Sequence, residues 1–309
     1  MRALCFLFLA ISSLPLFSQK MLQSHEWCAK KYGSYVPTTL LLEDGRSDSI
    51  DIIRTVVNLD LMNTPQIKAR CLLTVQGKMN GLNEIRLDLE GLTVDSVQGL
   101  NQSDWSFSQV GNSLFIDFPQ PLNVGVSTDF NVFYHGVPPT DASGWGGYYN
   151  TGGYTFNLGV GFAADPHSFG RAWFPCFDNF VERSIFETAI TSPVGKPGFG
   201  NGLLIFSDSS ADAQLRIWLQ EDPIPSYLAC FAIGPYTSFK RTYAGEAGQI
   251  PVEIAAAPAD TNKVRNTFIN LSKAIDVYED WFGPYKWDKI GYSRRYGTRH
   301  QHCHWTRLY

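Results

Sequence analysis

The segment 165–178 concentrates charged, aromatic and turn-forming residues in a pattern that neither helix nor strand periodicity produces; it reads Asp-Pro-His-Ser-Phe-Gly-Arg-Ala-Trp-Phe-Pro-Cys-Phe-Asp. Arg171 and Asp178 flank the apolar pair Trp173-Phe174, and Pro175 fixes φ and removes a backbone donor. A charge buried beside aromatic side chains needs a partner. The pattern therefore favours a structural ion pair between Arg171 and Asp178 that closes a loop between strands. The functional alternative is that this loop forms a wall of a substrate site.

Three motifs carry a resemblance to a known family. The run from Arg171 to Asp178 resembles the Arg-x-x-Phe-Pro-Cys-x-Asp-Glu-Pro motif in the N-terminal domain of the aminopeptidase N-like zinc metallopeptidases, peptidase family M1. Asn179-Phe180 replaces the Glu-Pro end of that motif, which indicates a divergent branch. Val-Phe-Tyr-His-Gly at 132–136 resembles the family's apolar-x-Tyr-x-Gly strand, and the run Trp-Phe-Gly-Pro-Tyr-Lys-Trp-Asp-Lys-Ile at 281–290 resembles its Phe-Gly-x-Tyr-Pro-x-x-Lys turn. The resemblance extends over residues 132–290.

The resemblance implies a mainly β fold. A saddle-like, multi-sheet β domain is expected at 19–248, followed at 249–293 by the α+β beginning of a thermolysin-like catalytic domain. The resemblance implies that the residues of the first motif have a structural role, and here they are Arg171, Phe174, Pro175, Cys176 and Asp178. The parent enzyme implied is an exported zinc aminopeptidase whose partner is the free N-terminus of a peptide.

A zinc peptidase of this kind needs two His one helical turn apart, a Glu between them as general base, and a third carboxylate ligand. The 309 residues contain no His-Glu-x-x-His, and His25-Glu26 begins such a motif without its second His. No catalytic residue and no metal ligand is therefore assigned, and zinc is expected in the full-length parent rather than bound specifically to this chain. The chain is expected to be a truncated fragment, inactive alone.

The tail holds His300, His302 and His304 around Cys303, and alternation in a strand would put the three imidazoles on one face as a metal site. The composition changes abruptly after Ser293, however, and continues no earlier pattern. When codons permitted for residues 294–305 are reread one base later, the allowed residues include Gly-Gly-Met-Glu-His-Ala-Thr-Asn-Ile-Ala-Ile, which resembles the family's substrate-binding element. We therefore predict that 294–309 is an out-of-frame tail, which sequencing of the gene after the Ser293 codon tests.

Asp165 is the one candidate substrate-binding residue. In the resembling family, a carboxylate or amide upstream of the Arg-x-x-Phe-Pro motif helps to bind the amino terminus of the substrate. Asp165 lies near that place with one residue of offset, and a carboxylate there would pair with an ammonium group. The alternative is a turn residue before Pro166.

Periodicity places the other elements. Alternation and apolar runs predict the following strands: 53–61, 85–89, 130–134, 203–206, 215–219, 227–233 and 250–256. The Gly- and Tyr-rich segment 144–154 is expected to be an ordered β-turn region, although such a loop could also stack on a ligand. Apolar residues at intervals of three and four from Val264 to Phe282 predict one helix capped by Asp260 and stopped by Gly283-Pro284. Its apolar face is expected to remain exposed in this chain.

Composition sets the remaining limits. The net charge of -4 and the lack of a long basic run exclude the usual electrostatic basis for binding nucleic acid. Arg2 precedes an apolar run that ends near Ser18, which predicts a signal peptide at 1–18 and export to the periplasm or beyond. The run is shorter than a membrane span, so no stable membrane insertion is expected. Two other functions remain open: an exported β-sheet binding or adhesion module, and a metal-binding protein that uses the His tail.

Overall fold

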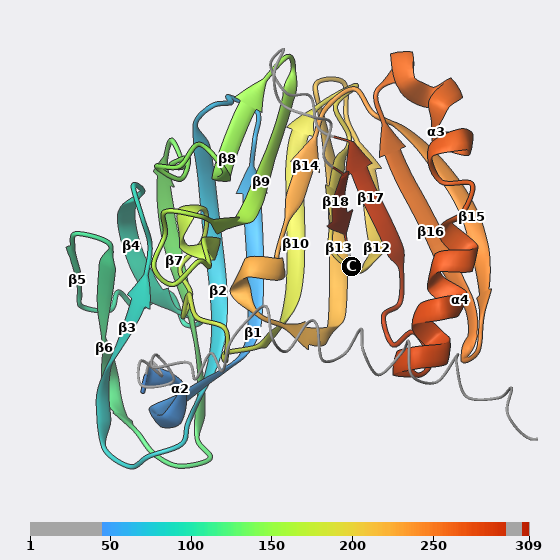
Figure 1. Ribbon diagram of the computed structural model, residues 1–309. Helices are drawn as coiled ribbons and strands as arrows, with labels where there is room; N and C mark the ends of the chain where they lie inside the picture. The colour runs from blue at the N-terminus through green and yellow to red at the C-terminus, as the bar shows by residue number, and fades with distance from the viewer. Residues whose placement is uncertain (1–44, 295–304, 309) are drawn as a thin grey trace, which may run out of the picture. The chain divides into compact units, whose positions relative to one another are not determined.

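The computed structural model describes residues 45–294 and 305–308 of the chain. The predicted signal peptide, residues 295–304 of the predicted out-of-frame tail, and Tyr309 lie outside the described residues. Within the described part, the chain is mainly β, as expected (Figure 1). The expectation of several sheets followed by an α+β segment is confirmed.

The largest sheet has seven strands in the order β12-β13-β10-β1-β2-β7-β4. Its strands are β1 (Ile50–Asp60), β2 (Ile67–Gly77), β4 (Thr93–Gly99), β7 (Ser127–Gly136), β10 (Ser184–Pro193), β12 (Leu203–Ser209) and β13 (Ala213–Ile224). A short helix, α2 (Arg46–Ser49), leads into β1. Strands β1 and β10 pair in parallel, and their neighbours pair antiparallel. Residues alternate between buried and open along β2, which is the pattern of a sheet with one face on the core.

Two smaller sheets complete the β part. One has the order β3-β6-β5, from β3 (Leu82–Asp88), β5 (Phe107–Val110) and β6 (Ser113–Leu122). The other has the order β11-β14-β9-β8, from β8 (Gly146–Thr151), β9 (Tyr154–Gly161), β11 (Gly198–Gly200) and β14 (Phe231–Ile233). The segment 144–154, expected to be an ordered β-turn region, contains β8 and the turn into β9, and this turn uses Gly152 and Gly153 at φ of 59° and 82°.

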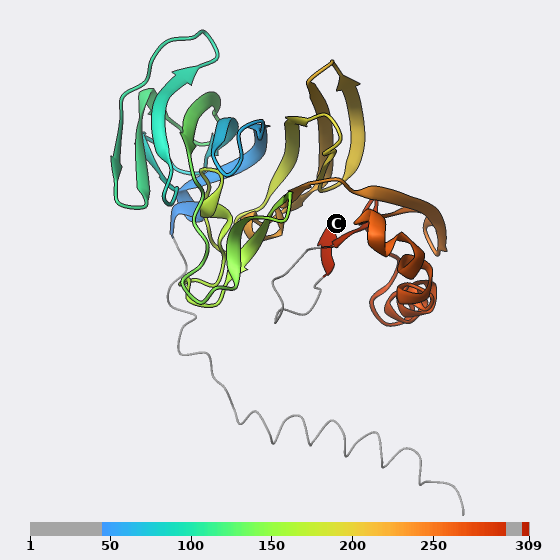
Figure 2. The same ribbon diagram turned by 90° about the horizontal axis from the view of Figure 1, so that it is seen from above.

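The last described part is α+β. A four-stranded sheet has the order β15-β16-β17-β18, from β15 (Thr237–Gly245), β16 (Gly248–Ala256), β17 (Ile290–Arg294) and β18 (Trp305–Leu308). Between β16 and β17 lie a 3-10 turn, η3 (Pro258–Asp260), and two helices, α3 (Thr261–Thr267) and α4 (Leu271–Phe282). Both helices lie on one side of this sheet (Figures 1 and 2). The predicted domain boundary at 248 falls after the first residue of β16, just beyond its turn from β15, and it stays a prediction.

Two sequence predictions were wrong in detail. The expected single helix is broken between Thr267 and Leu271, and Asp260 makes no capping hydrogen bond with its side chain. Asn266 lies in the last turn of α3 and Asn270 lies in the break, and their short polar side chains favour turns over helix interiors. The run 227–233 was expected to be one strand, but a 3-10 turn, η2 (Ser226–Leu228), precedes the short strand β14.

One large apolar core joins the seven-stranded sheet to its two smaller neighbours. Trp173, Phe174 and Phe177 of the motif segment are 0 to 1% exposed within it. A second core lies between the β15-β16-β17 part of the last sheet and the two helices, and it includes Ile254, Val264 and Ile275. The expectation that the apolar face of the helical segment stays exposed is therefore wrong for Val264 and Ile275, whereas Phe282 at the end of α4 is exposed.

Candidate functional site

The motif segment lies between β9 and β10, and it passes through the large core. It forms a 3-10 turn, η1 (Gly170–Ala172), and then the buried run Trp173-Phe174-Pro175-Cys176. The Cys176 N–H donates to the Asp88 carbonyl at 3.2 Å, and the Asp88 N–H donates back to the Cys176 carbonyl at 2.8 Å. The motif is thus attached to the end of β3, about 90 residues earlier in the chain.

Arg171 and Asp178 form the ion pair that the sequence predicted. Arg171 Nη1 lies 2.8 Å from Asp178 Oδ2, and the side chains are 13% and 0% exposed. Arg171 Nε donates to Glu90 Oε2 at 2.9 Å, and Nη1 also donates to the Ser168 carbonyl at 3.0 Å. The guanidinium thus joins two carboxylates and a loop carbonyl. These contacts support the structural interpretation of the pair.

Asp178 accepts further hydrogen bonds on its other carboxylate oxygen. Ser226 Oγ donates to Asp178 Oδ1 at 2.7 Å, and the Gly170 N–H donates to the same oxygen at 3.0 Å. Both carboxylate oxygens therefore have partners, which is how a buried charge is tolerated. Ser226 lies in η2, so this one side chain connects the motif to a segment 48 residues away.

Burial and pairing act in opposite directions on this site. Burial alone would lower the pKa of Arg171, but attraction to Asp178 and Glu90 outweighs it and raises that pKa above its ordinary value. Burial raises the pKa of Asp178, and hydrogen bonds from Ser226, Arg171 and Gly170 oppose that rise. Burial also raises the pKa of the Cys176 thiol well above its ordinary value. Cys176 is therefore a core residue rather than a reactive thiol.

The network continues to the beginning of the described chain. The Asp178 N–H donates to Asp88 Oδ2 at 3.0 Å, and Arg46 Nη2 lies 2.7 Å from the same oxygen. Tyr134, which belongs to the second sequence motif, donates its hydroxyl to the Trp173 carbonyl at 2.9 Å. The first two sequence motifs of the resemblance are therefore in direct contact, which their spacing along the chain alone did not reveal.

The loop before the motif is held at both ends. The Gly161 N–H donates to the His167 carbonyl at 3.1 Å, and the Phe169 N–H donates to the Gly159 carbonyl at 2.7 Å. Asp141 accepts from the Ala163 N–H at 3.0 Å. Burial would raise the pKa of Asp141, but hydrogen bonds from Ser143 and the loop outweigh it and lower that pKa. Asp141 is thus a charged support for this loop, and sequence reasoning missed it because it lies 22 residues before Ala163.

Asp165 lies in the exposed middle of this loop, between buried Ala164 and exposed Pro166. It makes no hydrogen bond or ion pair with any residue in the described part of the chain. His167 points back into the loop, with Nδ1 2.8 Å from the Ala164 carbonyl. The loop therefore presents a free carboxylate on a backbone that is fixed on both sides. The role of Asp165 in substrate binding stays a prediction.

The described residues offer no metal centre. In residues 45–294, no group of three or more His, Cys, Asp or Glu side chains lies close enough to hold an ion. The residues present there therefore do not fit a zinc site. The three closely spaced His of the tail lie outside the described residues. In the same described part, no helix is long and apolar enough to cross a bilayer.

Comparison with known proteins shows what this architecture is similar to. No protein-family model matches the chain. It is 28% identical over 217 residues to leucine aminopeptidase 2 of Vanderwaltozyma polyspora, a match that covers 66% of this chain and 30% of that protein. Among solved structures, it is similar to an M1 zinc metallopeptidase from Deinococcus radiodurans, with a TM-score of 0.70, 22% identity, and coverage of 79% of this chain and 56% of that one.

Aminopeptidase A of Legionella pneumophila, solved in complex with aspartic acid, is similar with a TM-score of 0.65 and 21% identity, over 79% of this chain and 28% of that one. The chain thus spans about half the length of the Deinococcus protein and less than a third of the other two.

These matches show that the fold is that of the M1 zinc metallopeptidases. The resemblance drawn from the sequence motifs, to the aminopeptidase N-like members of that group, is confirmed.

Proposed function

We propose that this chain is the substrate-side part of an exported zinc aminopeptidase, and that Asp165 receives the free ammonium group of the peptide to be trimmed. The observation that carries the proposal is the position of Asp165: its carboxylate is exposed, and its loop is fixed by Asp141 on one side and by the Arg171–Asp178 pair on the other. A carboxylate on a rigid support pairs with a cation at low entropic cost.

The proposal includes export through the signal peptide at 1–18 and a parent enzyme that uses zinc to hydrolyse the first peptide bond. The zinc-binding helix belongs to the parent and not to these 309 residues, which contain no His-Glu-x-x-His. The chain as given therefore binds peptide N-termini and releases no amino acids. A mutant of the similar Deinococcus metallopeptidase has been solved bound to the substrate Tyr-Ser-Ala, which supports peptides as partners.

A pair of peptides tests the proposal. The dissociation constants of Leu-Gly-Gly and its N-acetylated form are measured by NMR titration on the purified chain and on the Asp165→Ala variant. A free ammonium paired with an exposed carboxylate contributes about 1 kcal/mol, so the free peptide should bind roughly fivefold more tightly than the acetylated one. Asp165→Ala should remove that difference.

Asp212→Ala is the matched control, because Asp212 is another exposed aspartate, in the turn before β13. It should keep the preference for the free amine. Equal binding of both peptides to the unmodified chain, or a preference that survives Asp165→Ala, would reject the assignment. Release of leucine from Leu-Gly-Gly by the chain alone would contradict the inactive part of the proposal.

A further inference from the structure

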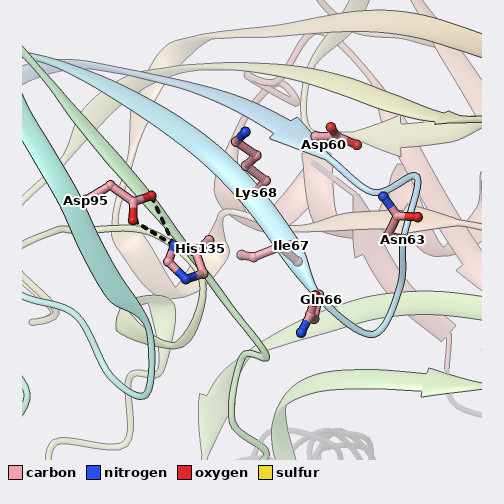
Figure 3. Close-up of a pocket in the computed structure, with 7 residues that line it drawn as sticks. All are labelled: Asp60, Asn63, Gln66, Ile67, Lys68, Asp95 and His135. Atoms are coloured by element: carbon pink, nitrogen blue, oxygen red, sulfur yellow. Dashed lines mark hydrogen bonds and ion pairs between the residues drawn. The ribbon is translucent and has the colours of Figure 1, made fainter.

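A pocket of about 500 Å³ opens on the seven-stranded sheet, at the end where β1 turns into β2 (Figure 3). Six polar residues and Ile67 line it; the polar ones are Asp60, Asn63, Gln66, Lys68, Asp95 and His135. They come from β1, the β1–β2 turn, β2, β7 and β4, so no single sequence motif contains them. The pocket contains none of the residues of the Asp165 loop.

The strand register sets the charges in a row. Lys68 pairs across the ladder with Asp60 on one side and with His135 on the other. Directly opposed residues in neighbouring strands have side chains about 5 Å apart on the same face of the sheet. A cationic side chain therefore stands between an acidic one and an imidazole. The spacing suits a ligand that carries both charges a few ångströms apart.

At the far end of the row, His135 is hydrogen-bonded to Asp95. His135 Nδ1 lies 2.8 Å from Oδ1 and 3.0 Å from Oδ2 of Asp95 (Figure 3). Since an ionised carboxylate only accepts, the proton is on Nδ1 and the imidazole orientation is fixed. Asp95 is thereby engaged, and Asp60 remains as the acid that faces Lys68.

The other polar groups of the pocket have hydrogen-bonding atoms that are available to a ligand. The Lys68 ammonium makes no ion pair or hydrogen bond with any residue in the described part of the chain, and the same holds for the side chains of Asn63 and Gln66. Asp60 uses Oδ1 to accept from the Met62 N–H at 2.9 Å, which leaves Oδ2 for a ligand. The pocket therefore offers one cation, one carboxylate oxygen and two amides.

We infer that this pocket binds a free α-amino acid with a polar side chain, its carboxylate on Lys68, its ammonium on Asp60, and its side chain on the amides of Asn63 and Gln66. A simple anion would also meet Asp60, and a simple cation would also meet Lys68, so each is disfavoured against a zwitterion. The inference uses none of the residues of the proposed peptide site, so the two stand or fall separately.

L-Glutamine is the probe, and NMR titration of the isotope-labelled chain is the measurement. Millimolar binding is expected, with the largest amide shifts in residues 60–68 and at His135. N-Acetylglutamine lacks the ammonium and glutaminamide lacks the carboxylate, and each should bind at least about fivefold more weakly, as should glutamine to Lys68→Gln or Asp60→Asn. Leucine should bind more weakly than glutamine, because its side chain pairs with neither amide.

Lys273→Gln and Asp212→Asn are the matched controls, since they neutralise an exposed lysine on α4 and an exposed aspartate before β13. Both should bind glutamine as the unmodified chain does. The inference is overturned by the absence of binding near the solubility limit of glutamine, by shifts confined to other residues, or by affinities for the two half-charged analogues that equal the affinity for glutamine. Unaltered binding to Lys68→Gln, with circular dichroism showing a folded variant, would overturn it as well. Equal binding of leucine would remove the assignment of the side chain.

Discussion

Removing the charge of Asp178 tests whether the ion pair with Arg171 holds the motif in place. Asp178→Asn keeps the shape of the side chain and one oxygen for Ser226 and Gly170. It also turns an amide toward Arg171 Nη1, which now lies 2.8 Å from Asp178 Oδ2. The new amide N–H group and Arg171 Nη1, both donors, would then face each other at a site where the Arg171 side chain is only 13% exposed. Breaking one partner of a buried pair costs about 3–5 kcal/mol, which we expect here as the loss in free energy of unfolding.

Urea unfolding followed by tryptophan fluorescence measures this loss, because Trp173 is fully buried beside the pair. Glu90→Gln is the matched control: it removes the other carboxylate on Arg171, but at a side chain that is 26% exposed, so about 1 kcal/mol is expected. Adding Arg171→Met to Asp178→Asn removes the uncompensated charge. The double variant should therefore lose at least about 1 kcal/mol less than the two single losses added together.

A loss from Asp178→Asn no larger than that from Glu90→Gln would refute a buried ion pair that holds the motif, since burial of the charge would then carry no penalty. Such a pair is refuted equally if the losses of the two single variants simply add. In that case Arg171 and Asp178 would contribute independently, and the loop would be held by its backbone hydrogen bonds.

The remaining predictions concern the pH dependence of stability and the exposed aromatic side chains at the end of α4. Lys289 donates to the Gly200 carbonyl at 3.0 Å, and burial lowers its pKa from 10.5 to about 8. Between these two pH values the unfolded chain binds one proton more than the folded chain. The free energy of unfolding should therefore rise with pH across that window. The full shift corresponds to roughly 3 kcal/mol, and this rise should disappear in Lys289→Met when urea unfolding is compared at pH 7 and pH 10. On α4, Trp281 and Phe282 are 74% and 81% exposed, so a Trp281→Gln/Phe282→Gln variant should bind less of a hydrophobic dye and aggregate more slowly than the unmodified chain.

Two results would contradict these predictions. An identical pH profile for Lys289→Met would mean that the buried amine carries no penalty for its charge. Unchanged dye binding after Trp281 and Phe282 are replaced would mean that these exposed side chains do not drive association. Light scattering during heating would check the same point independently.

Local pattern was enough for much of the fold. Alternation located the central strands, because a strand with one face on the core must alternate, as β2 does. The Arg171–Asp178 pair was readable because its members lie seven residues apart, on either side of aromatic residues that had to be buried. The run at 227–233 misled because apolar residues also fill a 3-10 turn, and there the Cys230 N–H donates to the Asn201 side chain instead of to a strand.

The parts that escaped prediction depend on contacts distant in sequence. Glu90 and Ser226 reach the motif from 81 residues before Arg171 and 48 residues after Asp178. The pocket beside Lys68 is assembled by register across neighbouring strands, and a shift by one residue would move its side chains to the other face. No short window of sequence contains that information.

A crystal structure of the chain with Leu-Gly-Gly at high concentration would show directly whether Asp165 binds the amino terminus of a peptide. We expect the peptide's ammonium at hydrogen-bond distance, about 2.8 Å, from the Asp165 carboxylate. A peptide seated elsewhere with its amino group turned to solvent, while Asp165 stays free, would contradict that expectation.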